Sequence, residues 1–458
     1  MKRKQRRLTM YAASLGITVI MALIFAFAWY SYYNHEIIEP FYRKGNWLVI
    51  FIYVVLIYVF FKIYGGFKYG YLTTSNIIYS QSISIFIVNV ITYLQIALIG
   101  RAFLRPGVLL LMTVLQIIVL MGYAIIVNKV YYAIYPPRKM IIVYGSSLKD
   151  SLIGKISMRK EKYRVCASVS SYEDMDVIFD RISKYEAVIL CDVKSETRNK
   201  ILKYCFDQSI RVYITPKLSD IIMRGADEIN LFDTPLLLCR NRGLNFEQRF
   251  FKRAVDLIVS AVAIIVFSPF MLIAAICIKL YDGGPVLYKQ KRSTIGGRIF
   301  EIYKFRSMVV DAEKDGKAVL ASRNDDRITP IGKIIRRYRI DELPQLFNIF
   351  VGDMSLVGPR PERPEIGEEY AKVMPEFRYR LKVKAGLTGY AQVIGKYDTT
   401  AYDKLKMDLM YIESYSFFLD IKLILMTVKT MFQKESSQGV EEKSSVSGND
   451  NEDKDDLQ

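Results

Sequence analysis

Long apolar runs separated by short polar loops fill the first third of the chain. Four such runs occur, at residues 10–33, 47–64, 79–100 and 107–128. A helix needs roughly 20 mostly apolar residues to cross the hydrocarbon core of a bilayer, and each run approaches that length. The pattern therefore predicts a membrane protein in which residues 1–135 form a bundle of four transmembrane helices.

Charged residues between these runs predict which way the bundle faces. Lysine and arginine collect on the cytoplasmic side of membrane helices. Basic residues precede the first run, follow the second and follow the fourth, which places both ends of the bundle in the cytoplasm. Arg43, Lys44, Arg101 and Arg105 lie in the other loops and weaken this bias.

The apolar runs become short beyond the bundle. Four strand-like segments alternate there with polar, helix-like stretches, at residues 141–144, 163–169, 187–191 and 211–214. Such alternation is typical of a parallel α/β sheet, so residues 136–245 are predicted to form a small Rossmann-like domain. Gly145, Ser146 and Ser147 stand where a dinucleotide-binding fold has three spaced glycines. The missing fingerprint favours a structural or regulatory role over nucleotide binding.

A fifth apolar run covers residues 257–280, within a helix predicted at 254–281. As a straight helix the run would be about 36 Å long, which is enough to span a bilayer. Ser268-Pro269 sits at its midpoint, however, and proline bends a helix because it removes a backbone donor. Basic residues flank both ends, so a re-entrant helix keeps both flanks cytoplasmic, whereas a plain spanning helix does not. The Ser268 hydroxyl is a candidate partner for the backbone freed at the break.

Composition indicates a membrane part joined to a soluble part. Hydrophobic residues make up 52% of the chain, but 24% of residues are charged, which is too many for membrane helices alone. The formal net charge is +18, although residues 441–458 hold seven acids and two lysines. The rest of the chain is therefore strongly basic, which suits binding to anionic lipid or to a phosphate-bearing substrate. No motif indicates nucleic-acid binding. The polar, acidic residues 436–458 are predicted to be a disordered tail.

Several kinds of active site are excluded by residue usage. The only histidine is His35, beside the first apolar run, so Ser-His-Asp triads and histidine-rich metal sites are excluded. Five cysteines are scattered without a CxxC spacing, which favours neither a disulfide framework nor a zinc site. Catalysis would therefore use carboxylates, Lys, Arg, Tyr or a metal held by oxygen ligands.

Two adjacent acids, Asp341 and Glu342, stand out in the last third of the chain. Pro344 fits the first turn of a helix, so the acids are expected at a helix N-terminus, which attracts phosphate. Nearby cations are Lys304, Arg306, Lys333, Arg336, Arg337, Arg339, Arg360 and Arg363. Two carboxylates among phosphate-binding cations suit phosphoryl transfer. On composition alone, however, such a cluster is more often a surface network of salt bridges.

The stretch DELPQLFNIFVGDMSLVGPRP, residues 341–361, resembles the signature of the bacterial sugar transferases, the monotopic polyprenyl-phosphate phosphoglycosyl transferases. Further blocks of that pattern occur in order: Lys252-Arg253 with Asp256, Ser268-Pro269, GPVLYKQKR at 284–292, IYKFRSM at 302–308 and KAGLTGYAQV at 384–393. The apolar bundle and α/β domain in front resemble the long subgroup of the family.

The resemblance implies a mainly helical catalytic domain over residues 246–435, with the re-entrant helix inside it. It implies transfer of hexose 1-phosphate from a UDP-hexose to undecaprenyl phosphate with release of UMP, the initiating step of capsule, exopolysaccharide or O-antigen synthesis. The expected location is the bacterial inner membrane, with the catalytic domain on the cytoplasmic face. Glucose and galactose are the default hexoses, and a homo-oligomer is left open.

The resemblance also implies residue roles. Asp341 would be the nucleophile that forms a covalent phospho-sugar enzyme, and Glu342 would help it to hold Mg²⁺, so both acids are expected metal ligands. The expected phosphate-binding cations are Lys304, Arg306, Arg336 and Arg360. The residues expected to fix or break the membrane helix at the interface are Lys252, Arg253, Asp256, Ser268 and Pro269.

Two alternatives stay open from the sequence. One is a membrane glycosyltransferase that releases UDP and forms no covalent intermediate, and the other is a membrane sensor or scaffold without catalysis. The chain also departs from the family pattern at Ser293-Thr294, Tyr338-Arg339, Ala385 and Ile394. None of these departures affects the acids, so they bear on loop geometry and sugar specificity.

Overall fold

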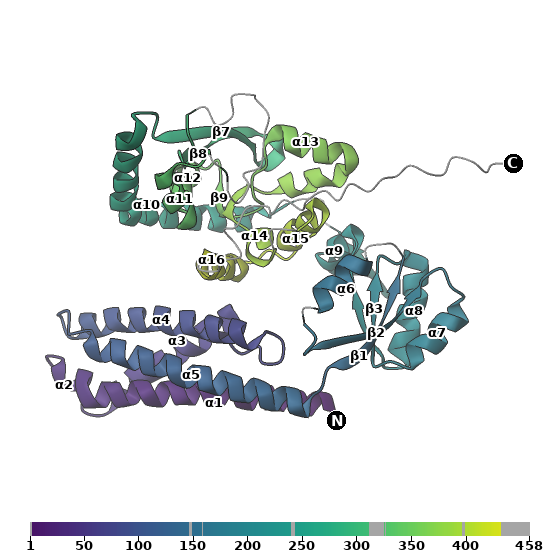
Figure 1. Ribbon diagram of the computed structural model, residues 1–458, viewed down its shortest axis with the longest axis horizontal. Coiled ribbons are helices and arrows are strands. Elements are labelled where there is room, and N and C mark those ends of the chain that lie inside the picture. Colours follow the sequence, from purple (N-terminus) through teal and green to yellow (C-terminus); the bar gives the residue numbers. More distant parts are fainter. Residues whose placement is uncertain are drawn as a thin grey trace. The chain divides into compact units, whose positions relative to one another are not determined.

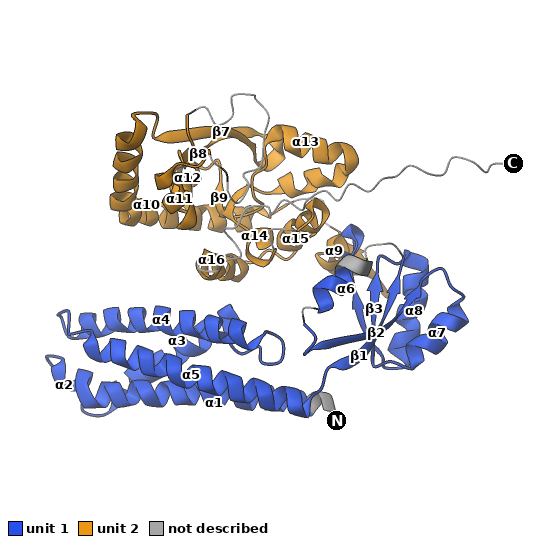
Figure 2. Ribbon diagram, viewed as in Figure 1, with its two compact units in different colours: residues 1–220 blue, residues 221–458 orange. Residues whose placement is uncertain are grey.

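The computed structural model describes residues 2–145, 149–157, 159–239, 243–310, 325, 327–395 and 399–431. These residues fall into two compact units, 1–220 and 221–458 (Figure 2). The expected tail at 436–458 and the expected turn at Ser146 and Ser147 lie outside the described residues. The division into four domains stays a prediction.

Apolar helices dominate the start of the first unit. They are α1 (Lys2–Ala28), a π-helical turn (Trp29–Tyr33), α2 (Asn34–Glu36), α3 (Lys44–Tyr64), α4 (Thr74–Ile99) and α5 (Gly107–Ile134). By length and composition, four helical stretches in this unit could cross a membrane, among the residues that the structure describes. The long helices α1, α3, α4 and α5 lie side by side (Figure 1). The four apolar helices predicted here are confirmed.

A closed ring of hydrogen bonds joins three helices inside this bundle. The Tyr53 hydroxyl donates to Asn89 Oδ1 at 3.1 Å, Asn89 Nδ2 donates to Gln116 Oε1 at 2.9 Å, and Gln116 Nε2 donates to the Tyr53 hydroxyl at 2.8 Å. All three side chains are buried. Polar groups inside a membrane bundle find partners on neighbouring helices, so the ring fixes the register of α3, α4 and α5.

A four-stranded parallel sheet follows the bundle, with strand order β2-β1-β3-β4. The strands are β1 (Arg138–Tyr144), β2 (Tyr163–Ser170), β3 (Ala187–Cys191) and β4 (Arg211–Ile214). The helices are α6 (Lys149–Ser157), α7 (Met175–Ser183), α8 (Ser195–Asp207) and α9 (Leu218–Arg224). Apolar residues of α7 and α8 pack on one face and those of α6 on the other (Figure 1). The predicted strands and their parallel arrangement are confirmed.

Gly145 has a structural explanation at the end of β1. A Cβ atom at this position would collide with the backbone carbonyl oxygen of Asp192, in the loop after β3. The Gly145 amide donates to the Cys191 carbonyl at 3.0 Å. Close packing of two loops therefore requires glycine here, with no need to invoke a bound nucleotide.

The second unit is mainly helical. Its helices are α10 (Phe246–Asp282), α11 (Pro330–Arg337), α12 (Gln345–Val351), α13 (Pro364–Val373), α14 (Tyr390–Ile394), α15 (Ala401–Glu413) and α16 (Phe417–Met431). Its 3-10 turns are η2 (Ile295–Gly297), η3 (Ile340–Glu342) and η4 (Pro375–Lys382). Three strand pairs complete it: antiparallel β5–β6 (Asp227–Leu231, Thr234–Leu238), antiparallel β7–β8 (Leu287–Ser293, Ile299–Phe305) and parallel β9–β10 (Ser355–Val357, Gly386–Thr388).

Helix α10 is the fifth apolar helix long enough to cross a membrane. It holds 37 residues with Pro269 inside, and its ribbon changes direction along its length (Figure 1). Pro269 cannot donate to the carbonyl of Ile265, and the Ser268 hydroxyl donates to that oxygen instead, at 2.8 Å. This is the hydrogen bond expected of Ser268 beside the proline, and the place of Ser268 and Pro269 at a membrane interface stays a prediction.

Candidate active site

Asp341 and Glu342 lie in the single 3-10 turn η3, between α11 and α12. Arg339 precedes the turn in the left-handed conformation, with φ 54°, which redirects the chain after α11 ends. Ile340 and Leu343 on either side of the acids pack against an apolar cluster formed by α10, α11 and β8. The apolar neighbours anchor the turn, so the acids between them are held in place.

The expected helix N-terminus is corrected by this geometry. Helix α12 begins at Gln345 with Pro344 at its N-cap, so the acids precede it by a separate turn. The Leu346 amide already donates to the Leu343 carbonyl at 3.0 Å, and the Phe347 amide donates to that of Pro344 at 3.1 Å. Amides engaged in this way do not attract phosphate, so cationic side chains must supply the attraction.

Three cations surround the Glu342 carboxylate, which is 14% exposed. Lys304 Nζ lies 3.8 Å from Oε1, Arg360 Nη2 lies 3.4 Å from the same oxygen, and Arg339 Nη1 lies 3.3 Å from Oε2. Burial on its own raises the pKa of Glu342, but the surrounding positive charges, that of Arg360 foremost, outweigh burial and lower it. Glu342 is therefore an ionised, charge-compensated acid.

Asp341 is in a different electrostatic position. Burial raises its pKa, and the adjacent negative charge of Glu342 raises the pKa further. The positive charges of Lys304, Arg336 and Arg339 oppose this shift without cancelling it. Among the described residues, no hydrogen bond or ion pair holds the Asp341 carboxylate. Asp341 is thus the acid of the pair that lacks a direct cationic partner among the described residues.

The four cations expected at the site separate into two groups. Lys304 and Arg360 contact Glu342 directly, and Arg336 lies close enough to act on Asp341. Arg306 is instead buried and forms an ion pair with Asp282, the last residue of α10. Its role as a phosphate ligand stays a prediction, in a place separate from the other three.

A small pocket opens beside Lys304 and Arg360, the two cations that contact Glu342 Oε1. It is lined by Arg292, Ile302, Lys304, Gln345, Arg360, Pro361, Gly386 and Leu387. Arg292 was not expected at the site, although it ends the GPVLYKQKR block. Burial and the nearby charge of Arg360 lower the pKa of Arg292 to about 10, which leaves it protonated at neutral pH.

The segment that carries Arg360 is fixed by three successive carbonyl groups. The Arg360 carbonyl accepts from Arg380 Nη2 at 2.9 Å, the Pro361 carbonyl accepts from Arg292 Nη1 at 3.0 Å, and the Glu362 carbonyl accepts from the Ser293 amide at 3.0 Å. Because each carbonyl has its own donor, the backbone that presents the Arg360 guanidinium to Glu342 is held along its length.

Arg380 is held in turn by a fully buried acid. It lies 2.9 Å from Asp408 Oδ2 in α15 and 3.4 Å from Glu362 Oε1. Burial raises the pKa of Asp408 to about 6, against the opposing charge of Arg380. Asp408 and Arg380 therefore connect α15 to the Arg360 segment.

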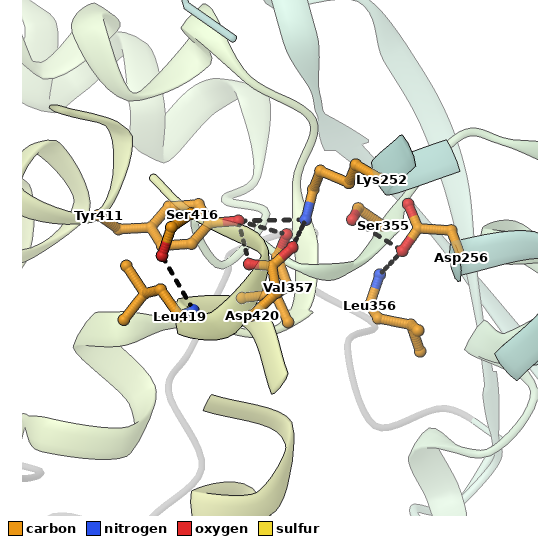
Figure 3. A network of polar contacts seen from close by, with 9 residues as sticks. All are labelled: Lys252, Asp256, Ser355, Leu356, Val357, Tyr411, Ser416, Leu419 and Asp420. Atoms are coloured by element: carbon orange, nitrogen blue, oxygen red, sulfur yellow. Dashed lines mark hydrogen bonds and ion pairs between the residues drawn. The ribbon is translucent and has the colours of Figure 1, made fainter. Parts of the chain in front are cut away.

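The first turns of α10 are joined by a buried ionic cluster to the rest of the second unit, which is called the catalytic body below (Figure 3). Lys252 Nζ lies 2.5 Å from Asp420 Oδ2 and 3.1 Å from the Tyr411 hydroxyl, and that hydroxyl donates to Asp420 Oδ1 at 2.8 Å. Asp256 accepts from the Ser355 hydroxyl at 3.1 Å and from the Leu356 amide at 2.9 Å. The cluster joins α10 to β9, α15 and α16.

Arg253 forms a second tie between α10 and the catalytic body. It donates to the carbonyl groups of Ile349 and Phe350, at 2.7 and 2.8 Å. Both carbonyl groups lie in the last turn of α12, where a positive charge is favourable. The level of Lys252, Arg253 and Asp256 relative to a membrane stays a prediction.

Comparison with known proteins identifies the family. The model of the family described as bacterial sugar transferase matches residues 247–434, which include the acid pair and all of α10 but its first residue. A UDP-glucose:undecaprenyl-phosphate glucose-1-phosphate transferase from Caulobacter vibrioides is 40% identical over 192 residues, which are 41% of this chain and 71% of that protein. The chain belongs to the bacterial sugar transferase family. The family inferred from the DELPQ block is confirmed.

Two further relatives extend the comparison for this bacterial sugar transferase. A UDP-N-acetylgalactosamine-undecaprenyl-phosphate N-acetylgalactosaminephosphotransferase from Aeromonas hydrophila is 44% identical over 40% of this chain and 44% of that protein. An undecaprenyl-phosphate glucose phosphotransferase from Komagataeibacter xylinus is 33% identical over 64% of this chain and 58% of that protein. The matched region thus spans about half the length of these two relatives. The four apolar helices at the N-terminus fit the long subgroup of bacterial sugar transferases.

Proposed function

We propose that this bacterial sugar transferase moves a hexose 1-phosphate from a UDP-hexose to undecaprenyl phosphate and releases UMP. The observation that carries the proposal is the contrast between the two acids: Glu342 is compensated by three cations, whereas Asp341 beside it is not. The names of the relatives, which pair a sugar phosphate with undecaprenyl phosphate, support the same substrates. The step would initiate capsule, exopolysaccharide or O-antigen synthesis.

Asp341 is the proposed nucleophile. Its carboxylate oxygen attacks the phosphorus that bears the hexose, the bond from that phosphorus to the bridging oxygen breaks, and UMP leaves with the electron pair. A terminal oxygen of undecaprenyl phosphate then attacks the same phosphorus, and the bond to Asp341 breaks, which restores the carboxylate. Water kept away from the site protects the acyl phosphate between the two steps.

The cations beside the acids are proposed to stabilise the charge on the donor. Arg292, Lys304 and Arg360 line the pocket next to Glu342 and can bind the two phosphates of UDP-hexose. Positioned cations are the main means by which enzymes lower the barrier to phosphoryl transfer. Glu342 keeps these cations in place before the donor arrives.

Mg²⁺ fits the residues at the acid turn. Mg²⁺ takes oxygen ligands, usually one or two carboxylates together with substrate phosphates, and Asp341 and Glu342 are adjacent carboxylates. Within the described ranges, no cluster of three or more His, Cys, Asp and Glu residues could hold a metal by itself, so a metal here would be shared with the donor. When bound, Mg²⁺ would neutralise charge on the diphosphate.

Helix α10 is proposed to enter the bilayer and return to the cytoplasmic face. A straight helix of its length would extend about 55 Å, yet Arg253 near its start and Asp282 at its end both contact the same catalytic body. Ile258, Ile265, Phe270 and Leu272 on α10 are more than half exposed, which suits contact with lipid. A returning helix keeps the acids where UDP-hexose is available and brings them to the bilayer surface.

The test of the proposed function is a nucleotide assay. Purified protein is supplied with undecaprenyl phosphate, Mg²⁺ and a panel of UDP-hexoses, and the released nucleotide is identified. UMP released with one donor would support the proposal and identify the hexose. Release of UDP would indicate a glycosyltransferase, and no release with any donor would favour a scaffold or sensor.

A further inference from the structure

A second pocket lies at the C-terminal end of α10, separate in its lining from the pocket beside Glu342. It is lined by Ile278, Tyr281, Arg306, Thr329 and Ile331. The last turns of α10 supply Ile278 and Tyr281, and the start of α11 supplies Ile331. Arg306 is the one charged residue in this lining, so the pocket combines apolar walls with a single cation.

Arg306 is buried with part of its hydrogen-bonding capacity unused. Its side chain is 8% exposed, and its guanidinium forms an ion pair with Asp282 through Nη2. The other terminal nitrogen, Nη1, is buried and has no hydrogen-bond partner among the described residues. A buried donor without an acceptor is destabilising, more so when it is charged, so this nitrogen calls for a ligand oxygen or a water.

Glycine at position 284 gives Nη1 its space. A Cβ atom added to Gly284 would collide with that nitrogen. A larger residue there would displace the end of the Arg306 side chain, so the loop after α10 and the guanidinium pack closely against each other.

The pocket lies next to the acid turn. Ile278 and Ile331 of its lining belong to the same apolar cluster as Ile340 and Leu343, which flank the two acids. Arg306 follows Lys304 by two residues of extended chain, which places their Cα atoms about 7 Å apart, and Lys304 reaches Glu342. Two pockets therefore lie near the acid turn, one rich in cations and the other apolar with a single cation.

We propose that this second pocket binds the phosphate end of the isoprenoid lipid acceptor. Arg306 Nη1 donates to a phosphate oxygen, and Ile278, Tyr281 and Ile331 contact the first isoprene units. This inference rests on the proposed function and extends it, because it assigns the nucleotide donor to the pocket of Arg292, Lys304 and Arg360 and the lipid to the pocket of Arg306. The apolar walls favour a lipid over inorganic phosphate, which shares only the anionic chemistry.

Two half-reactions can be measured apart to test these assignments: release of UMP from the donor, and transfer from the enzyme to undecaprenyl phosphate. In Arg306→Gln, we expect the burst of UMP from donor and enzyme alone to stay within about twofold of the wild type, while the KM for undecaprenyl phosphate rises about tenfold or more, the loss expected for one charged hydrogen bond. In Tyr281→Ala, which removes a wall of the pocket without altering its charge and lies outside the apolar cluster behind the acid turn, we expect the same split. The matched control is Arg298→Gln, an exposed arginine that also pairs with an aspartate, and it should change neither quantity.

Two results would overturn the proposal: an equal fall of both half-reactions in Arg306→Gln and Tyr281→Ala, or an unchanged KM for the lipid in both. A binding assay keeps the test independent of turnover. Undecaprenyl phosphate retained by the full chain is measured by native mass spectrometry, with phosphatidylglycerol and inorganic phosphate as competitors. Retention that is lost in Arg306→Gln and resists both competitors supports the acceptor site, whereas displacement by either competitor overturns it. Absence of UMP from the wild type would reject the proposed function. The lipid-retention assay would still show whether the pocket of Arg306 binds undecaprenyl phosphate.

Discussion

The hydroxyl of Ser268 donates to the carbonyl of Ile265 at 2.8 Å, and Ile265 is the residue whose carbonyl loses its amide donor to Pro269. A side chain thus replaces a missing backbone hydrogen bond one residue before the proline. In a bilayer no water can make this replacement, so the pair allows a proline in the middle of an apolar helix.

Replacing Ser268 with alanine should destabilise the protein by about 1 kcal/mol, since polar contacts inside membranes are worth roughly 0.6 to 2 kcal/mol. The measurement is thermal unfolding in nanodiscs. Ser260→Ala is the matched control, because the Ser260 hydroxyl donates to the Leu257 carbonyl in uninterrupted helix, where the backbone amide four residues on also serves that carbonyl. Equal destabilisation by both variants would contradict the role of Ser268.

If α10 returns to the cytoplasmic face, the residues on both sides of it should be inaccessible from outside the cell. Cysteines placed at Arg249 and Tyr288, in a variant without other cysteines, should both resist a membrane-impermeant thiol reagent in intact cells. A cysteine at Tyr42, in the loop expected outside, should react. Labelling at position 288 but not at 249 would mean that α10 spans the membrane.

Asp341→Asn should lower turnover at least about 10⁴-fold, as removal of a nucleophile does in other enzymes, and the protein should remain folded. The assay is UMP release in the presence of undecaprenyl phosphate. Glu301→Gln is the control, since Glu301 is an exposed acid paired with Lys289 on the β7–β8 pair. Substantial activity in Asp341→Asn would exclude Asp341 as the nucleophile.

The pH dependence of the donor half-reaction should report Asp341. Burial and the charge of Glu342 raise the pKa of Asp341 above that of an ordinary aspartate, and attack needs the ionised form. The rate should therefore fall as the pH drops through this raised pKa. In Glu342→Gln one raising influence is gone, so the residual activity should persist to lower pH. A fall at the same pH in both proteins would show that another group controls the profile.

Arg380 should act on catalysis through Arg360. Because Arg380 donates to the Arg360 carbonyl and pairs with buried Asp408, Arg380→Gln should reduce the rate of UMP release about tenfold or more, the value of one buried charged contact. The double variant with Arg360→Gln should be no slower than Arg360→Gln alone, because residues that act as a unit are not additive. Additive losses would mean that Arg380 supports the fold in general.

Much of this architecture could be predicted because it depends on local pattern. The parallel strands and the five apolar helices follow from apolar runs of characteristic length, and the bond from Ser268 follows from the neighbouring proline. The β5–β6 hairpin was not predicted, since its strands are short and lie largely on the surface.

The features that were missed at the site depend on residues far apart in the chain. Arg292 acquires its place by donating to Pro361, 69 positions away, and Arg306 is drawn toward Asp282 across 24 positions. The turn that holds Asp341 depends on apolar neighbours of Ile340 in three other elements. No sequence window contains these partners.

The ring formed by Tyr53, Asn89 and Gln116 constrains how the membrane bundle can evolve. Each member donates one hydrogen bond within the ring and accepts another. Replacing any one with leucine would therefore leave one donor and one acceptor of the ring unsatisfied, and the surrounding hydrocarbon has no polar group to replace the lost partner. Relatives should therefore keep the trio intact or replace it as a set with apolar side chains.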